Sequence, residues 1–392
     1  MSRLDELINE FCPDGVEYKA ICEFCKVGTG KSNRQDADEN GEYPFYVRSK
    51  EVFLNNSYEF DEEAIIIPGE GSIGEIFHYV NGKYALHQRA YRIHIEDNYV
   101  ITKFLYYYMS QNFKKFIYQK AVNATVKSIR KPMIEKFVVP IPPLPVQREI
   151  VRILDNFTEL TAELTAELTE ELTARKKQYE YYRDSLLTFG GDVPMMRLGD
   201  IATDIYRGSG IKRDEITTAG IPCVRYGEIY TTYNVWFDQC VSHTVEEKIV
   251  NRKYFEHGDV LFAITGESVE DIAKSCVYMG QEKCLAGGDL VVMKHNQNPK
   301  YIGYALSTTS ARIQKSKGRV KSKVVHSNVT SISDIVIPIP SSIKEQERIV
   351  DILDRFDALC NDMTIGLPAE IEARQKQYEY YRDKLLSFKE KK

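Results

Sequence analysis

Two segments of the chain combine many lysines and arginines with no acidic residue, a composition suited to binding phosphate groups. They are FKKFIYQKAVNATVKSIRK (113–131) and RIQKSKGRVKSK (312–323). Cationic side chains neutralise phosphates, and nearby Tyr, Asn, Thr and His side chains can hydrogen-bond to base edges. The predicted contacts with nucleic acid are Lys114, Lys115, Lys120, Lys127, Arg130, Lys131, Arg312, Lys315, Lys317, Arg319, Lys321 and Lys323.

The two basic runs occupy corresponding places in the chain. Each precedes an apolar segment punctuated by proline, FVVPIPPLP (137–145) or IVIPIP (335–340), which we expect to be a strand. A single basic run can simply be a solvated charged face. Two runs at matching positions favour a shared binding role.

Two glycine motifs resemble nucleotide-binding loops but lack the required surroundings. GTGKS (Gly28–Ser32) resembles the end of a P-loop, but Cys25 stands where that loop needs glycine. Gly69, Gly71 and Gly74 match G-x-G-x-x-G, but a strand and a turn are expected next, where a dinucleotide site needs a helix. Both are interpreted as turns or loops.

No catalytic centre is predicted either. DIYRGSG (204–210) resembles the cofactor loop of amino-methyltransferases, but the Asn- or Asp-Pro-Pro-aromatic tetrapeptide of those enzymes is missing. Cys22 and Cys25 form a lone C-x-x-C, without a second pair at zinc-site spacing. We therefore expect no cofactor and no metal site.

The elements that position the basic runs belong to an internal repeat. KQYEYYRD occurs at Lys177–Asp184 and Lys376–Asp383, and QREIVRILDNFTEL (147–160) matches QERIVDILDRFDAL (346–359). The offset is 199 residues in both cases. Short β-rich runs between these segments repeat more faintly; PFYVRS (44–49), for example, resembles PCVRYG (222–227). The repeat predicts two globular domains, each followed by a long helix.

Both repeated segments have the apolar spacing of helices. In the first copy the stripe includes Leu160, Leu164, Leu168 and Leu172, within about 42 residues of helix that would extend ~63 Å. In the second copy Gly366 and Pro368 predict a kink. Two striped helices in one chain are expected to pack against each other, antiparallel.

Composition places the chain among ordinary globular proteins. The apolar fraction is 43%, the charged fraction is 28% and the net charge is −5. No apolar run approaches the ~20 residues of a membrane span, and the first residues lack a signal-peptide core. We expect a cytoplasmic protein without a membrane partner.

The helical segments resemble those of the specificity subunit of a type I DNA restriction-modification system. The similarity is strongest in LDELINEFCPDGVEY (4–18), in 147–184 and in 349–383, and it covers essentially the whole chain. It implies an α+β fold with two target-recognition domains joined by two long, conserved, antiparallel helices in a tandem repeat with pseudo-twofold symmetry. The implied ranges are domain 1 at 1–145, the central spacer helix at 146–190, domain 2 at 191–342 and the distal helix at 343–392.

The resemblance also implies the function and the partners. Each domain would recognise half of a bipartite, asymmetric sequence in double-stranded DNA, and the subunit itself would be non-catalytic. Two modification subunits, which bind S-adenosylmethionine and methylate adenine, would dock on the helices, and restriction subunits would join the full complex. The Thr-Ala-Glu-Leu tetrads at 161–168 resemble the family's spacer-setting repeat.

The repeated octapeptide supplies the candidate residues for docking. Two copies would let two identical partners bind one chain equivalently. The expected partner contacts are Tyr179, Tyr181, Tyr182, Tyr378, Tyr380 and Tyr381. The alternative is that these tyrosines only pack within the chain. For the whole chain, two other functions stay open: a DNA adenine methyltransferase or its recognition fragment, and a coiled-coil scaffold with no DNA role.

Overall fold

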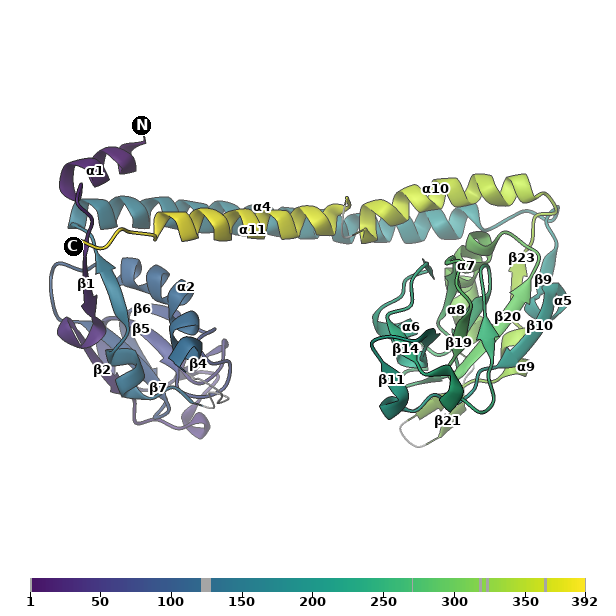
Figure 1. Cartoon of the computed structure of the whole chain (residues 1–392), viewed down its shortest axis with the longest axis horizontal. Helices are drawn as coiled ribbons and strands as arrows, with labels where there is room; N and C mark the ends of the chain where they lie inside the picture. The colour runs from purple at the N-terminus through teal and green to yellow at the C-terminus, as the bar shows by residue number, and fades with distance from the viewer. Residues whose placement is uncertain are drawn as a thin grey trace. The chain divides into compact units, whose positions relative to one another are not determined.

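The chain folds into two compact units. The computed structural model describes residues 2–120, 128–269, 271–316, 319–321, 324–362 and 365–391, with only the backbone described at 120, 319–321 and 324. Unit 1 comprises Met1–Ala166 and Glu372–Lys392, and unit 2 comprises Glu167–Ile371. Helix α4 (Leu144–Leu186) therefore belongs to unit 1 in its first half and to unit 2 in its second half (Figure 1). In the described part of the chain, no helix has the length and hydropathy to span a bilayer.

Unit 1 is built on a six-stranded sheet with the order β2-β7-β5-β6-β3-β4. Its strand pairs are antiparallel except β3 with β6, which is parallel. Helix α2 (Thr102–Lys120) covers the sheet because Leu105, Met109, Phe113 and Ile117 recur every four residues and join one core with the sheet residues. The strands are β2 (Cys25–Thr29), β3 (Tyr43–Tyr46), β4 (Val52–Asn55), β5 (Phe60–Pro68), β6 (His78–Leu86) and β7 (Ala90–Ile95).

Smaller elements complete unit 1. Helix α1 is capped by the Ser2 hydroxyl, which accepts the Asp5 N–H and so satisfies a free donor of the first turn. Strands β1 and β8 form a separate antiparallel pair. The bounds are α1 (Arg3–Phe11), β1 (Glu17–Ala20), α3 (Lys131–Glu135) and β8 (Val138–Ile141), with 3₁₀ turns at Ile21–Glu23 and Arg34–Asp36.

Unit 2 contains two five-stranded sheets, ordered β10-β20-β16-β18-β13 and β11-β14-β12-β19-β15. The central strand β16 (Val260–Ala263) is fully buried, and its residues alternate between two cores. Val260 and Phe262 pack with α7 (Pro299–Ser307), whereas Leu261 and Ala263 pack with residues of the second sheet. A three-stranded sheet, β17-β22-β21, and the antiparallel pair β23-β9 lie beside them.

The remaining elements of unit 2 are as follows. The helices are α5 (Leu198–Ile201), α6 (Tyr226–Thr231), α8 (Thr309–Lys315) and α9 (Val329–Ser333), with 3₁₀ turns at Arg213–Glu215 and Glu246–Lys248. The strands are β9 (Met195–Arg197), β10 (Ala202–Arg207), β11 (Ile216–Thr217), β12 (Ile221–Val224), β13 (Trp236–Phe237), β14 (Ser242–Thr244), β15 (Tyr254–Phe255), β17 (Thr265–Gly266), β18 (Ser275–Tyr278), β19 (Cys284–Ala286), β20 (Leu290–His295), β21 (Arg319–Lys321), β22 (Val324–His326) and β23 (Val336–Pro338).

The second copy of the repeat is two helices, α10 (Ile343–Asn361) and α11 (Leu367–Leu385), whereas the first copy is the single 43-residue helix α4. The break falls where Gly366 and Pro368 predict it. The expected antiparallel pairing is confirmed within each unit. In unit 1 the ring of Phe157 on α4 meets that of Tyr381 on α11, with centroids 6.1 Å apart. In unit 2 the ring of Tyr182 on α4 stacks on that of Phe356 on α10 at 5.4 Å.

These two ring contacts join corresponding residues: in each, a phenylalanine of one copy of the repeat meets a tyrosine of the other copy. Phe157 corresponds to Phe356 and Tyr182 to Tyr381 at the offset of 199. In each unit, therefore, the first segment of one copy packs against the octapeptide of the other copy. The helix pair carries the pseudo-twofold symmetry that the repeated sequence indicates.

Matching polar contacts fix the helices to their domains. Asp155 accepts hydrogen bonds from Lys103 (2.8 Å) and Tyr107 (2.7 Å) in unit 1. Its counterpart Asp354 accepts hydrogen bonds from Lys300 (2.6 Å) and Tyr304 (2.5 Å) in unit 2. Each carboxylate thus holds a helix of the repeat against the helix that follows the main sheet.

Two buried glutamines make a second matching set. Gln147 accepts the N–H of Ile101 and donates to the carbonyls of Tyr99 and Pro142. Gln346 accepts the N–H of Asn298 and donates to the carbonyl of Pro340 and the side chain of Gln297. Both glutamines have 0% exposure, so these bonds satisfy backbone groups that water cannot reach.

Replacing Gln346 by alanine should destabilise unit 2 by about 2–3 kcal/mol, because the Asn298 N–H and the Pro340 carbonyl lose their partner. Trp236 is the only tryptophan of the chain and lies in unit 2, so its fluorescence during urea unfolding reports on this unit. The matched control is Glu347→Ala, at the exposed neighbouring position. Equal urea midpoints for Gln346→Ala and Glu347→Ala would show that the buried hydrogen bonds of Gln346 do not stabilise unit 2.

Candidate nucleic-acid interface

The first basic run, on α2 and around α3, is partly neutralised by acidic neighbours. Lys114 forms an ion pair with Glu75, and Lys131 forms one with Glu135 at 3.5 Å. Lys114 and Lys131 are themselves exposed, so these pairs leave both lysines accessible to solvent and to phosphate. The basic side chains of this run that the structure describes are all exposed; they are Lys114, Lys115, Arg130 and Lys131. Lys127, Lys317 and Lys323 lie outside the described residues, and only the backbone is described for Lys120, Arg319 and Lys321.

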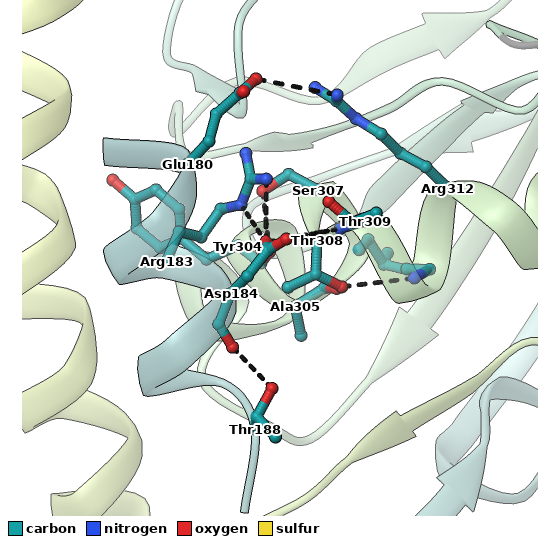
Figure 2. A network of polar contacts seen from close by, with 12 residues as sticks. Glu180, Arg183, Asp184, Thr188, Tyr304, Ala305, Ser307, Thr308, Thr309 and Arg312 are labelled. Atoms are coloured by element: carbon teal, nitrogen blue, oxygen red, sulfur yellow. Dashed lines mark hydrogen bonds and ion pairs between the residues drawn. The ribbon is translucent and has the colours of Figure 1, made fainter. Parts of the chain in front are cut away.

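The second basic run begins on α8, which packs near the second half of α4. Arg312 lies 3.8 Å from Glu180 of α4 (Figure 2). On the same side of α4, Asp184 accepts hydrogen bonds from the guanidinium of Arg183 at 2.9 Å and from the N–H of Thr309 at 3.3 Å. The start of this run therefore takes part in joining α4 to its domain.

Lys315 was predicted to contact nucleic acid, and its burial contradicts that prediction. Only 8% of it is exposed, and its ammonium group donates to the Ser275 hydroxyl (2.9 Å) and the Leu306 carbonyl (2.8 Å). Burial, and secondarily the charge of Arg312, lower the pKa of Lys315 to about 7. A side chain held in this way cannot reach a phosphate on the surface.

A different set of polar side chains gathers in unit 1 where strands β3 and β6 end. We call it the first strand-end cluster, and it surrounds a hollow of about 620 Å³. Arginine, glutamine and asparagine are the side chains that most often recognise base edges in DNA. The members are Asn33, Arg34, Gln35, Arg48, His87, Gln88 and Arg89.

Unit 2 has a second strand-end cluster around a hollow of about 870 Å³, where strands β12 and β19 end. It is rich in arginine and glycine, and it holds two carboxylates. Glycines let a ligand approach the backbone closely. The lining residues are Arg207, Gly208, Gly210, Ile211, Arg213, Arg225, Tyr226, Gly227, Glu228, Thr231, Gly287, Gly288 and Asp289.

Strand register gives the two clusters the same framework. Strands β3 and β6 are parallel, as are β12 and β19, so the carboxyl ends of each pair lie together. Beyond the first pair, the His87 N–H donates to the Tyr46 carbonyl at 2.9 Å. Beyond the second, the Gly287 N–H donates to the Val224 carbonyl at 2.9 Å.

A glycine directly after a strand lies at each cluster, Gly30 after β2 and Gly208 after β10. Gly30 lies so close to Leu86 that an added Cβ would be 1.8 Å from its carbonyl oxygen. The Cβ of a residue replacing Gly208 would be 2.1 Å from the Gly287 oxygen. Only glycine fits such approaches, which bring Ser32 beside His87 in unit 1 and Ser209 beside Gly287 in unit 2. GTGKS was interpreted as a turn; the structure instead makes it the end of strand β2 and the extended loop that follows.

Carboxylates hold several of the cluster arginines. Glu70 accepts hydrogen bonds from Arg48 (2.8 Å) and Arg89 (3.1 Å), and these guanidinium groups lower its pKa. In contrast, burial, aided by the charges of Arg48 and Arg89, lowers the pKa of His87. His87 is thus neutral near pH 7, and its Nδ1 accepts the N–H of Arg89 at 2.9 Å.

In the second cluster, Glu228 and Asp289 have the same role. Glu228 is buried and accepts hydrogen bonds from the Arg225 side chain at 3.1 Å and from the Ser242 hydroxyl at 2.6 Å. Arg207 donates to the Gly288 carbonyl at 2.6 Å and to Asp289 at 3.0 Å. Fixed guanidinium groups lose less conformational freedom when they bind a ligand.

Charge density along the sequence did not identify these clusters, because their residues come from three separate segments of the chain in each unit. The usable signals were weak and positional. The segments GTGKS and RGSGIK correspond to each other, and PFYVRS matches PCVRYG in the strands that precede Arg48 and Arg225. Together, these short matches locate both clusters.

The tyrosines of the octapeptides fall into three pairs. Tyr181 and Tyr380 are the most exposed, at 70% and 64%. Tyr182 and Tyr381 make the ring contacts between helices and are about 40% exposed. Tyr179 is a correction: it is buried in the core of unit 2 and cannot contact a partner. Its counterpart is Tyr378, whose hydroxyl lies 3.0 Å from that of Thr158.

The four spacer leucines continue the stripe of α4 without a break in the helix. Leu168 is buried, Leu164 and Leu172 are half-buried and Leu160 is exposed. Leu172 packs against the core of unit 2. The tetrads therefore lie in the stretch of α4 that passes from unit 1 to unit 2.

A family model described as a type I restriction modification DNA specificity domain matches residues 13–174 and again residues 190–373. The chain belongs to this family, which confirms the resemblance found in its sequence. A putative type I restriction enzyme specificity subunit of Haemophilus influenzae is 30% identical, over 95% of this chain and 96% of that protein. The EcoR124I/EcoR124II specificity subunit of Escherichia coli is 33% identical, over 75% of this chain and 72% of that protein.

Solved structures show the same fold. A chain from a study of complex assembly and conformational transition of the type I R-M system superposes with a TM-score of 0.69, at 14% identity, over 95% of this chain and 98% of that chain. The HsdS subunit of Thermoanaerobacter tengcongensis gives a TM-score of 0.53 at 15% identity, over 96% of this chain and 97% of that chain. The expected α+β architecture with two globular domains and long helices is thus confirmed.

The buried ammonium of Lys315 should make the stability of unit 2 depend on pH. In the unfolded chain lysine titrates near 10.4, so between pH 7 and 10 the unfolded state binds more protons at this site. The contribution of Lys315 to the free energy of unfolding then rises with pH, by up to ~1.4 kcal/mol per unit. Urea unfolding of wild type and Lys315→Met, followed by Trp236 fluorescence at pH 7, 8 and 9, measures this slope. If the difference in free energy of unfolding between wild type and Lys315→Met stays constant with pH, the pKa of Lys315 is not lowered in the folded protein.

Proposed function

We propose that the chain is the non-catalytic DNA-specificity subunit of a type I restriction-modification complex. Domain 1 (1–145) and domain 2 (191–342) each recognise one half of a bipartite, asymmetric site in double-stranded DNA. The observation that carries this proposal is the pair of strand-end clusters, which share a framework and differ in their side chains. A common framework suits two domains that do the same task, and different side chains suit two different half-sites.

The exposed lysines and arginines of the basic runs support the clusters by contacting phosphates. Phosphate contacts hold a protein on DNA regardless of sequence, whereas side chains at base edges select the sequence. Lys115 and Arg130 are exposed and suit the first role. Binding by such residues weakens as salt concentration rises.

The helices serve as the docking surface for two modification subunits, with restriction subunits in the full complex. The exposed pair Tyr181 and Tyr380 stands at corresponding positions of the repeated octapeptides. Exposed aromatic residues are frequent anchors of protein interfaces. The partners supply the methyl-transfer chemistry, which takes place in the cytoplasm.

The decisive experiment is single-molecule sequencing of DNA from cells that produce this chain together with the modification subunit of its system. A bipartite motif methylated on adenine and interrupted by a fixed gap supports the proposal. No methylation from a purified, assembled complex would overturn it. Methyl transfer by this chain alone would indicate a methyltransferase. A complex whose DNA affinity and salt dependence are unchanged when the exposed basic residues of this chain are neutralised would indicate a scaffold.

Replacing Tyr181 or Tyr380 by alanine should weaken binding of one modification subunit by about tenfold or more, because each variant removes one exposed aromatic anchor. The double variant should lose both subunits. Native mass spectrometry of the assembled complex counts them. Glu163→Ala, an exposed position on α4 outside the octapeptides, is the control and should retain two. Full assembly of the double variant would place the docking surface elsewhere.

Deleting the tetrad Thr165–Leu168 should shorten the unrecognised gap by about one base pair and leave both half-sites unchanged. Four residues change a helix by ~6 Å and by a net ~40°, and one base pair turns DNA by ~34–36°. The methylated motif of the deletion variant measures the gap. Thr165→Ala keeps the helix length and serves as control. An unchanged gap after the deletion would refute the spacer role.

A further inference from the structure

The side chains that select bases can be narrowed further by comparing the two strand-end clusters. We propose that Arg48 and Arg225 are specificity-determining residues, each recognising a guanine in the half-site of its own domain. This inference rests on the proposed function and assigns residues and a base to it.

The first argument is position. Arg48 is the second residue after β3 and Arg225 is the first residue after β12, and both strands end beside a parallel partner. The flanking hydrogen bonds, from His87 to Tyr46 and from Gly287 to Val224, are equivalent. In this register Tyr46 corresponds to Val224, so Arg48 lies one residue farther along the chain than Arg225. Both arginines nevertheless stand just beyond the carboxyl end of the corresponding strand.

The second argument is orientation. Arg48 donates one N–H to Glu70 at 2.8 Å, and Arg225 donates Nε–H to Glu228 at 3.1 Å. A guanidinium group has five N–H donors, so several remain after these bonds. The side chains of Arg48 and Arg225 are 44% and 35% exposed, so their free donors can reach a ligand.

The third argument is geometry. Two parallel N–H groups of arginine match the O6 and N7 acceptors of guanine in the major groove, which is the commonest base-specific contact. A carboxylate that fixes the guanidinium plane favours such a two-bond contact. It gives little advantage to a phosphate contact, which a flexible lysine can also make.

Three of the other cluster arginines are engaged differently. The guanidinium of Arg34 lies 3.5 Å from the centre of the Phe53 ring, so one of its faces is covered. Arg207 is held by Gly288 and Asp289. Arg89 shares Glu70 with Arg48, and the corresponding loop of unit 2 has no arginine.

Residues beside the two arginines differ between the units. The loop after β6 is His87-Gln88-Arg89, whereas the loop after β19 is Gly287-Gly288-Asp289. A guanine shared by both half-sites is therefore combined with different neighbours, which makes the whole site asymmetric.

The test uses the full methyltransferase complex carrying Arg48→Ala, Arg48→Lys, Arg225→Ala or Arg225→Lys. Methylated motifs are sequenced, and binding is measured on DNA duplexes with each base pair of the motif substituted in turn. At one G·C pair of one half-site, we expect Arg48→Ala to reduce the preference for the correct base pair over a substituted one by about tenfold to 100-fold. Arg225→Ala should do the same in the other half-site. In each case the gap and the remaining half-site stay unchanged.

The lysine variants separate base recognition from phosphate binding. Arg48→Lys and Arg225→Lys keep the charge but lose the planar pair of donors, so affinity should be largely kept and discrimination reduced. Lys115→Ala, which removes a proposed phosphate contact on α2, is the comparison variant: it should lower affinity for every duplex alike and leave the motif unchanged. Trp236 fluorescence checks that the Arg225 variants are folded.

Two results would overturn the assignment. One is an unchanged motif in the folded alanine variants. The other is an equal loss of affinity for every duplex that lysine restores, which would make these residues phosphate contacts. In both cases the wild-type chain would still give a bipartite motif. The absence of any motif with wild type would instead reject the proposed function.

Discussion

The exchanged packing of the repeated segments is the interaction on which the rest of the structure depends. The amphipathic stripe of either copy cannot be buried within that copy, because one helix cannot cover its own apolar face. Phe157 packs against Tyr381 of the other copy, and Phe356 packs against Tyr182. The repeated octapeptide therefore makes the same helix–helix contact in both units. Asp155 and Asp354 then fix each helix to the helix after the sheet, so each unit makes the matching contact between its repeat helix and its domain.

The strand-end clusters depend on a separate support within each unit. Residues that bind a ligand need rigid supports, and here the support is a parallel strand pair with a glycine packed against it. Gly30 and Gly208 allow backbone approaches that any side chain would prevent. The polar side chains are then held at short range by carboxylates. The position of each cluster follows from the backbone, and its chemistry follows from a few side chains.

The sequence predicted the large-scale organisation well because that organisation is periodic. The stripe of α4, the break at Gly366 and Pro368, and the antiparallel pairing all follow from helix geometry and repeated spelling. The candidate residues were harder to predict. Lys315 belongs to a charged run, yet a helical turn directs it inward to Ser275 and Leu306. Tyr179 is identical in sequence context to Tyr378, yet it is buried where Tyr378 is only partly covered. Neither difference can be read from composition, since each depends on neighbours distant in the chain.

The separation between framework and cluster residues has a functional consequence under the proposed role. Gln147, Gln346, Asp155 and Asp354 bind the helices, whereas Gln88, Arg89, Gly288 and Asp289 stand on loops that make none of these helix contacts. Substitutions in the second set leave the first set intact, so side-chain recognition can change in one domain without altering the helices or the other domain. Energetically independent sites of this kind add their effects. A single subunit can therefore acquire a new half-site by changes in one cluster while it keeps the same docking surface.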